Sequence, residues 1–240
     1  MLEIKNVTKS YGRDKKAVDN LNLTVEAGDI FGFIGHNGAG KTTTIKCVVG
    51  IHGFEQGEIL VDGISVKEKP LLCKEKISYV PDNPDIYEYL TGIQYLNFVA
   101  DIYKLSKEER EERIQKEAED FEITASLGDL ISSYSHGMKQ KLVLIGAMLH
   151  KPKLLVLDEP FVGLDPKAVH ILKEKMHHMC KEGSAIFFST HVLDTAEKLC
   201  NKAAIIKQGK LVAVGSMEEL TKGESLEQVF MEVAEYGASD

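Results

Sequence analysis

An α/β fold with a helical insertion is predicted by three features of this sequence of 240 residues. A short apolar run at 30–34 leads into a glycine-rich turn and then into a helix-like stretch from Lys41. Similar apolar runs, separated by helical patterns, follow at 77–80, 154–157 and 185–188. Residues 91–150 carry mostly helical patterns, so they are expected to form an insertion between two strands of the sheet.

The segments around this core follow the ordinary rules for strands and turns. Apolar and polar residues alternate over the first 25 residues, as they do in half-buried strands. Glycines separate two short extended segments within 57–67. Gln208–Gly209 joins the strand-like segments 203–207 and 210–214, which predicts a hairpin.

Three helices can be placed from their residue types. The charged run 107–122 is typical of a helix with one solvated face. Asp165 and Pro166 have the residue types of a helix N-cap and first helical position. The last helix would place on one face the apolar residues Leu226, Val229, Phe230 and Val233.

Composition and charge narrow the class of protein. Hydrophobic residues make up 43% of the chain, and no apolar stretch approaches the roughly 20 residues of a membrane-spanning helix. The first residues lack the pattern of a secretory signal. The net charge of −8 and the scarcity of arginine disfavour nucleic-acid binding. The four cysteines form no C-x-x-C pair, which favours a reducing, cytoplasmic setting over a disulfide framework or a zinc site.

Residues 35–42 match the pattern G-x-x-x-x-G-K-[ST] of a phosphate-binding loop. Its glycines let backbone N–H groups turn toward an anion, and the helix that follows presents its positive end. Lys41 would reach the β- and γ-phosphates, and the Thr42 hydroxyl would bind Mg²⁺. A glycine turn with an incidental lysine is the alternative, but the position between a strand and a helix favours the phosphate loop.

A carboxylate pair follows the apolar run at 154–157. Asp158 stands where the second half of such a site places an Mg²⁺ ligand. Glu159 points elsewhere and could orient or deprotonate an attacking water. Taken alone the pair is a weak signal, because strand ends are often acidic. Ser135 begins another helix as a plausible N-cap, and a capped, glycine-containing helix start is also a surface for phosphate.

Together these motifs resemble the nucleotide-binding subunit of ATP-binding cassette (ABC) transporters, over essentially the whole sequence and in the family's order. The resemblance implies that Tyr11 stacks on adenine, Asp165 lies in the D-loop, and His191 is the switch histidine that contacts the γ-phosphate. It implies catalytic roles for Lys41, Glu159 and His191. It assigns ATP binding to Tyr11, Gly35, Asn37, Gly38, Ala39, Gly40, Lys41, Thr42, Thr43, Ser135, Gly137 and Asp165.

Two motifs depart from the family's pattern. The signature L-S-G-G-Q is here Tyr134-Ser-His-Gly-Met138, which keeps the serine and the second glycine. Ser135 and Gly137 are therefore the groups expected to meet a phosphate. Asp82 stands where the family has the Q-loop glutamine. Aspartate keeps an oxygen for a metal-bound water but is shorter, charged and without an amide donor, and the expected metal ligands are Thr42, Asp158 and Asp82.

The resemblance also implies a fold and its division. The fold is a P-loop NTPase (RecA-like) core with an N-terminal antiparallel β subdomain and an inserted helical subdomain. The core with its β subdomain would comprise 1–82 and 151–222, the helical signature subdomain 83–150, and a short C-terminal helix 223–240.

The implied function is that of an ATP-hydrolysing motor subunit with ATP and Mg²⁺ as cofactors. Two copies, or this chain and a close paralogue, would stack head to tail, with ATP between the Lys41 loop of one and the Ser135 helix of the other. An integral membrane permease on a separate chain would dock on the helical insertion and the loop 82–90. The subunit would lie peripherally on the cytoplasmic side of the membrane, most like the bacterial ABC-2 exporters, without a nucleic-acid partner.

Other interpretations of the chain remain open or are disfavoured. A soluble, non-transport ABC ATPase acting on a protein assembly is the main alternative. A translation-type factor normally carries two cassettes and this chain has one, and intact Lys41, Asp158 and Glu159 oppose a non-enzymatic module. The guanine-specific pattern N-K-x-D is absent, which favours ATP. A metal site at His177, His178 and Cys180 is less plausible than the apolar stripe that Cys180 continues, and no chemistry is assigned to His36.

Overall fold

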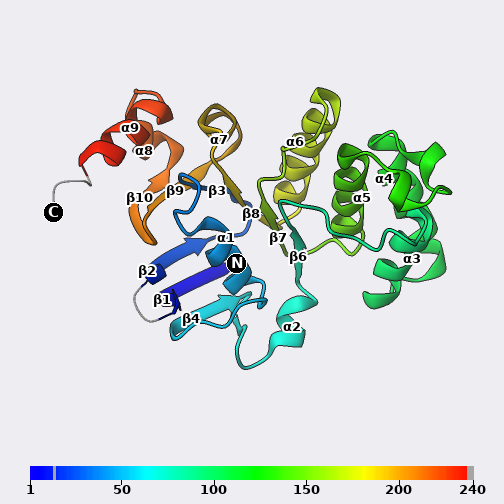
Figure 1. Ribbon diagram of the computed structural model, residues 1–240, viewed down its shortest axis with the longest axis horizontal. Coiled ribbons are helices and arrows are strands. Elements are labelled where there is room, and N and C mark those ends of the chain that lie inside the picture. Colours follow the sequence, from blue (N-terminus) through cyan, green and yellow to red (C-terminus); the bar gives the residue numbers. More distant parts are fainter. Residues whose placement is uncertain (13–14, 237–240) are drawn as a thin grey trace.

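Two β-sheets and the helices that cover them make up the computed structural model, which describes residues 1–12 and 15–236 (Figure 1). The described strands are β1 (Leu2–Tyr11), β2 (Lys15–Val25), β3 (Ile30–Ile34), β4 (Gln56–Val61), β5 (Ile64–Ser65), β6 (Ile77–Val80), β7 (Leu154–Asp158), β8 (Ala185–Thr190), β9 (Lys202–Lys207) and β10 (Lys210–Ser216). The described helices are α1 (Lys41–Val48), α2 (Pro70–Lys74), α3 (Gly92–Ile102), α4 (Lys107–Asp120), α5 (His136–Met148), α6 (Pro166–Lys181), α7 (Leu193–Leu199), α8 (Met217–Thr221) and α9 (Leu226–Tyr236), with 3₁₀ turns at Thr124–Ser126 and Ile131–Ser133. The fold is α/β, as the alternating patterns predict.

The larger sheet brings the ends of its parallel strands to one edge. Its order is β10-β9-β3-β8-β7-β6, with β3 parallel to β8 and β9, and β7 parallel to β6 and β8. Ile34 pairs with Thr190, and Asp158 pairs with Ser189. Because the carboxyl ends of parallel strands share an edge, the segments that follow β3, β7 and β8 lie side by side.

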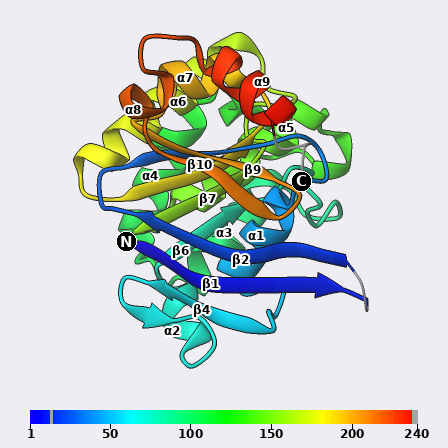
Figure 2. The same ribbon diagram turned by 90° about the vertical axis from the view of Figure 1, so that its left-hand side faces the viewer.

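One face of the larger sheet packs on α1 and on the smaller antiparallel sheet, whose order is β2-β1-β4-β5. Alternate residues of each strand point into this core, among them the buried Phe31, Phe33 and Phe187. The rings of Phe33 and Phe187 lie 5.3 Å apart between centroids. Figure 2 shows the smaller sheet as a layer of its own beside the larger one.

Helices cover the other face of the larger sheet. Leu155, Leu157 and Phe188 point into a second core, which α5, α6 and α7 help to form. Helices α3, α4 and α5 lie together at the end of the molecule away from the smaller sheet (Figure 1). In the sequence, these helices lie between β6 and β7. The charged run predicted to be a solvated helix is α4, which buries Ile114 and Ala118.

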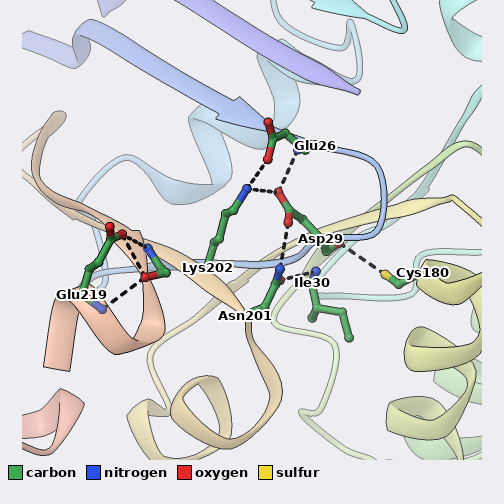
Figure 3. Close-up of polar contacts among 8 residues, drawn as sticks. Glu26, Asp29, Ile30, Cys180, Asn201, Lys202 and Glu219 are labelled. Carbon is green, nitrogen blue, oxygen red and sulfur yellow. Dashed lines mark hydrogen bonds and ion pairs between the residues drawn. The ribbon is translucent and has the colours of Figure 1, made fainter. Parts of the chain in front are cut away.

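A polar network fastens the opposite edge of the sheet, where β3 and β9 begin (Figure 3). The buried Asp29 carboxylate accepts a hydrogen bond of 2.8 Å from the side chain of Asn201, and lies 3.1 Å from the Lys202 ammonium. Asn201 in turn accepts a bond of 2.8 Å from the Ile30 N–H, and Lys202 also pairs with Glu26. The buried Asp29 carboxylate is thus satisfied by Asn201 and Lys202, and the network joins the turn before β3 to β9.

Several expectations can be compared with these elements. The strands predicted at 30–34 and 77–80 have the predicted bounds, and the Gln208–Gly209 hairpin joins β9 to β10. The four cysteines are buried and free. Helix α9 covers part of the predicted segment 223–240, of which 237–240 lie outside the described residues. The domain boundaries at 82/83, 150/151 and 222/223 stay predictions. Within the part of the chain that the structure describes, no helix has the length and apolar character needed to cross a bilayer.

Candidate functional site

The glycine loop between β3 and α1 forms a turn that presents backbone N–H groups. It ends at Gly40, whose φ is +112° and whose Cβ, if present, would lie 2.4 Å from the Ala17 carbonyl oxygen. Only glycine fits this position without displacing backbone. The first-turn N–H groups of an α-helix have no intrahelical acceptor, and no side chain among the described residues caps those of α1. These N–H groups and the positive end of α1 make an anion site.

The Lys41 side chain folds back over this loop. Its ammonium donates a hydrogen bond of 2.6 Å to the Gly35 carbonyl and one of 3.3 Å to the His36 carbonyl. The side chain is only 6% exposed, and its Nζ lies 3.5 Å from Oε1 of Glu159. The cation is therefore held at the mouth of the loop, where a bound phosphate would find it.

Asp158, the last residue of β7, is a buried carboxylate with one oxygen unused. Ser189 of β8 donates a hydrogen bond to Oδ1, while Oδ2 accepts none from any described residue. Burial raises the pKa of this carboxyl, and repulsion from Asp82 and Glu159 adds to the rise, while the nearby hydroxyls of Ser189 and Thr42 oppose it. An unpartnered buried oxygen beside the loop is the donor that a divalent cation requires.

Glu159 and His191 meet at the same edge. Oε1 of Glu159 lies 3.0 Å from Nδ1 of His191, and the histidine side chain is half exposed. The Glu159 backbone has a φ of +48°, which is uncommon outside glycine, and its N–H donates to the Ser189 hydroxyl at 3.1 Å. This turn directs the Glu159 side chain toward the loop rather than into the sheet.

Lys41, Glu159 and the glycine loop open into one cavity of about 830 Å³, while Asp158 and His191 lie outside its lining. It is lined by Tyr11, Lys15, Lys16, Ala17, His36, Asn37, Gly38, Gly40, Lys41, Thr42, Thr43, Asp82, Glu159, Gln208 and Gly209. Tyr11, at the end of β1, is 48% exposed and meets the His52 ring edge-on at 6.0 Å between centroids. A tyrosine face with one open side fits the predicted stacking on a base.

Sequence reasoning missed part of this lining. Lys15, Lys16 and Ala17 come from β2, and Gln208–Gly209 is the β9–β10 turn, which was predicted only as a hairpin. The Gly209 N–H donates to the Ala39 carbonyl at 2.8 Å, so the hairpin turn holds the glycine loop from the side. Neither segment carries a motif, and their place in the site follows from the packing of the smaller sheet on the larger one.

Three predicted ATP ligands lie elsewhere. Ser135 caps α5 by accepting a bond of 3.3 Å from the Met138 N–H, and Asp165 caps α6 and lies 2.7 Å from the Lys141 ammonium. Neither these residues nor Gly137 are among the described residues that line the cavity. Gly35 and Ala39 belong to the loop but also stay outside the lining. Within one chain the Ser135 surface is therefore separate from the Lys41 loop.

The histidine that replaces the first signature glycine has a packing role. The ring of His136 lies against Gly163, where an added Cβ would come 2.4 Å from Cδ2 of the imidazole. An added Cβ on Gly137 would also lie 2.7 Å from the Gly163 carbonyl oxygen. Together with the Lys141–Asp165 ion pair, these contacts fix the start of α5 to the loop before α6.

The donor set around the cavity suits Mg²⁺ only together with phosphate. Within the described residues, no cluster of three or more His, Cys, Asp or Glu side chains could hold a metal ion. Mg²⁺ is commonly bound by one or two carboxylates, substrate phosphates and water. The free oxygen of Asp158, the Thr42 hydroxyl and the Asp82 carboxylate at the cavity wall fit that requirement.

The phosphate loop, the acidic strand end and the shared edge of parallel strands define a P-loop nucleotide-binding protein. A protein-family model described as ABC transporter matches residues 18–162. Since this match covers more than half of the chain, the chain belongs to the ABC transporter family. It is an ATP-binding subunit of a transporter and an ATPase, which confirms the predicted resemblance, fold class and activity.

Individual relatives agree over nearly the full length. The ABC-type transporter ATP-binding protein EcsA of Bacillus subtilis is 35% identical, over 99% of this chain and 98% of that protein. The Nod factor export ATP-binding protein I of Cupriavidus metallidurans is 32% identical, over 93% of this chain and 74% of that protein. A solved structure of an ATP-binding subunit of an ABC transporter is 33% identical, with a TM-score of 0.94 over 98% of this chain and 99% of that one.

Proposed function

We propose that this chain is the ATP-driven motor of an exporter, working with a second nucleotide-binding subunit and a separate membrane permease. The observation that carries the proposal is the division of the ATP-binding groups. The Lys41 loop, Glu159 and His191 share one edge, while Ser135 lies on a different surface of the same chain. A second copy that presents its Ser135 surface to the cavity would complete the site.

The hydrolysis step can be derived from the side chains at this edge. The loop N–H groups and Lys41 would hold the β- and γ-phosphates and offset the negative charge that spreads over them in the transition state. Glu159 would accept a proton from the attacking water. His191, whose Nδ1 lies 3.0 Å from Oε1 of Glu159, would contact the γ-phosphate and hold the glutamate in place. Mg²⁺ bound by Asp158, Thr42 and Asp82 would neutralise charge on the phosphate oxygens.

Dimerisation would then depend on the γ-phosphate. This is the part of ATP that both surfaces can contact, so ATP favours the closed pair and hydrolysis removes that preference. Val162, three residues after Glu159, and Val192, directly after His191, are exposed, and a second subunit would cover such apolar side chains. The same closed arrangement would bring Ser135 and Gly137 to the phosphate and Asp165 to the interface.

A groove between α1, α2 and α3 supports the permease contact. It has a volume of about 500 Å³ and includes Ile51, Leu71, Ile102 and Tyr103 among its lining residues. Most of these apolar side chains are exposed, and the neighbouring Phe98 on α3 meets Tyr87 edge-on at 5.8 Å between ring centroids. Because the chain is a subunit of a transporter, we assign this groove to an amphipathic cytoplasmic segment of the permease.

The direction of transport is supported by relatives rather than by geometry. One relative, which is 32% identical to this chain, has a name that states export of Nod factor. Export through a permease on another chain is therefore the proposed process, at the cytoplasmic face of the membrane.

Co-purification from washed membranes tests the proposal. The tagged chain should retain one integral membrane protein, and Ile102→Glu should release it while ATP hydrolysis by the isolated subunit persists. Val214→Glu is the matched control, because Val214 is 54% exposed on β10 and Ile102 is 57% exposed. Retention of an importer-type permease with a substrate-binding protein would contradict export. Absence of any membrane partner would favour a non-transport ATPase.

A further inference from the structure

The C-terminal helix reaches the phosphate loop through one ring contact. Phe230 of α9 is 8% exposed, and its ring meets the His36 ring at 4.7 Å between centroids, with the ring planes at 64°. His36 lies in the glycine loop and lines the nucleotide cavity. Edge-to-face pairs of this kind stabilise a contact beyond the area that they bury. A residue near the end of the chain therefore touches the loop that binds phosphate.

Helix α9 is itself anchored close to the other side of the site. The Leu226 N–H donates a hydrogen bond of 2.9 Å to the Glu197 carboxylate of α7, and the Leu226 side chain is fully buried. Ser225 and Gln228 cap the start of α9 by mutual hydrogen bonds. Since α7 begins two residues after His191, α9 is fixed to the helix that follows this histidine.

The contact can be followed from α9 to the lysine. The His36 carbonyl accepts a hydrogen bond of 3.3 Å from the Lys41 ammonium. His36 is an exposed residue, and the contact with Phe230 restricts the orientation of its ring. Restricting His36 would restrict one of the two carbonyls that hold the Lys41 ammonium, beside that of Gly35, and so help to order the loop before nucleotide arrives. Such preorganisation raises affinity because less conformational freedom is lost on binding.

We propose that Phe230 is a positioning residue for nucleotide binding, which acts through His36 on the loop that carries Lys41. The inference rests on the proposed role of Lys41 as a phosphate ligand. Helix α9 thus sets the ATP affinity of the subunit, although Phe230 itself does not line the cavity.

The test measures the equilibrium Kd for a fluorescent ATP analogue and the KM and kcat of the full-length subunit. Phe230→Leu keeps an apolar side chain but removes the ring, and should raise Kd and KM about two- to tenfold with little change in kcat. His36→Ala should give a similar rise, and the double variant should give no further rise, because both remove the same contact. Phe230→Tyr keeps an aromatic ring at this position and should bind the ATP analogue with wild-type affinity.

A second variant separates positioning from packing. Val229 is the neighbour of Phe230 on α9 and packs on the helix-covered core without a ring contact to the loop. Val229→Ala should lower the melting temperature while leaving Kd unchanged. An unchanged Kd in Phe230→Leu, or additive effects in the double variant, would overturn the proposal. Normal ATP binding by Lys41→Ala would contradict the proposed function as well as this inference. If Lys41→Ala loses ATP binding while Phe230→Leu does not, only this inference fails and the proposed function stands.

Discussion

Lys41 and Glu159 face each other at the edge of the nucleotide cavity, with Nζ 3.5 Å from Oε1. Both side chains are largely shielded from solvent, so the pair interacts more strongly than a surface pair. A γ-phosphate bound between them would compete for the ammonium. The glutamate would then be released from its cationic partner. We therefore propose that this pair connects phosphate binding to the start of hydrolysis.

Glu159→Gln should bind ATP and lose turnover. Glutamine keeps the size of the side chain but cannot accept the proton of the water, which reduces kcat by about 10²–10⁴-fold. The substitution also removes the negative charge of Glu159 beside the place that the γ-phosphate would occupy. The ATP-bound pair of subunits should therefore accumulate. Size-exclusion chromatography with Mg-ATP measures this, and Glu182→Gln, at an exposed site on the C-cap of α6, should behave like the wild type. Unchanged hydrolysis would remove Glu159 from its proposed role.

Lys41→Ala should weaken ATP binding with little loss of stability. Hydrogen bonds from a charged group contribute about 1.5–3 kcal/mol, which corresponds to an affinity loss of about 10- to 150-fold. The fold should persist, because the ammonium contacts loop carbonyls and Glu159 rather than the apolar core. Calorimetric titration and thermal melting would check both statements. Lys46→Ala, in the last turn of the same helix, should leave the affinity unchanged.

Asp158→Asn should stabilise the nucleotide-free protein while abolishing Mg²⁺-dependent hydrolysis. Burial raises the pKa of Asp158, so the folded state holds the proton more tightly than the unfolded state. The ionised form therefore costs stability above the folded-state pKa, and this cost is relieved as the pH falls through it. We expect an unfolding free energy higher by about 1 kcal/mol at neutral pH, seen as a rise of about 2–4 °C in Tm.

The pH series is the sharper part of that test. The stability difference between Asp158→Asn and the wild type should narrow as the pH is lowered, since the wild-type carboxyl then takes up a proton. Asp85→Asn, at an exposed position, should show no such difference. If Asp158→Asn were less stable than the wild type at neutral pH, burial of the ionised Asp158 carboxylate would not destabilise the folded protein.

His150 should make the protein sensitive to mild acid. Its ring stacks on Tyr103 at 3.5 Å between centroids, and burial lowers its pKa to about 4. The unfolded chain takes up a proton near pH 6.5 and the folded chain does not, so stability is full above pH 6.5 and falls below it. The loss should reach about 2 kcal/mol by pH 5. Denaturant unfolding at several pH values measures this dependence of the unfolding free energy on pH. It should disappear in His150→Gln but persist in His177→Asn, whose ring is exposed.

The sequence predicts most of the fold and the phosphate half of the site because local patterns specify them. Gly40 and Lys41 lie in a motif whose chemistry requires their spacing, and β3 and β7 are apolar runs of strand length. Asp158 is the last residue of β7 and His191 directly follows β8, so parallel pairing places both near the loop. Family membership and the α/β fold are confirmed on this basis, while the individual roles of the site residues remain predictions.

Other features depend on contacts between distant segments. The Gly209–Ala39 hydrogen bond and the lining by Lys15 and Lys16 arise from how the two sheets pack. The ring contact between His36 and Phe230 requires α9 to lie against α7, which no pattern in either segment indicates. The position of the Ser135 surface relative to the cavity likewise depends on how the helical insertion as a whole packs on the larger sheet.

We propose that a triphosphate held by Lys41 is contacted by Ser135 of a second copy. A crystal structure of Glu159→Gln with Mg-ATP tests it most directly, through the distance from Ser135 Oγ to the γ-phosphate. We predict two copies per assembly and a hydrogen bond of about 2.5–3.0 Å from the Ser135 hydroxyl of one copy to the phosphate bound by the other. An empty Lys41 loop, or a bound γ-phosphate with no contact from a second copy, would contradict the account.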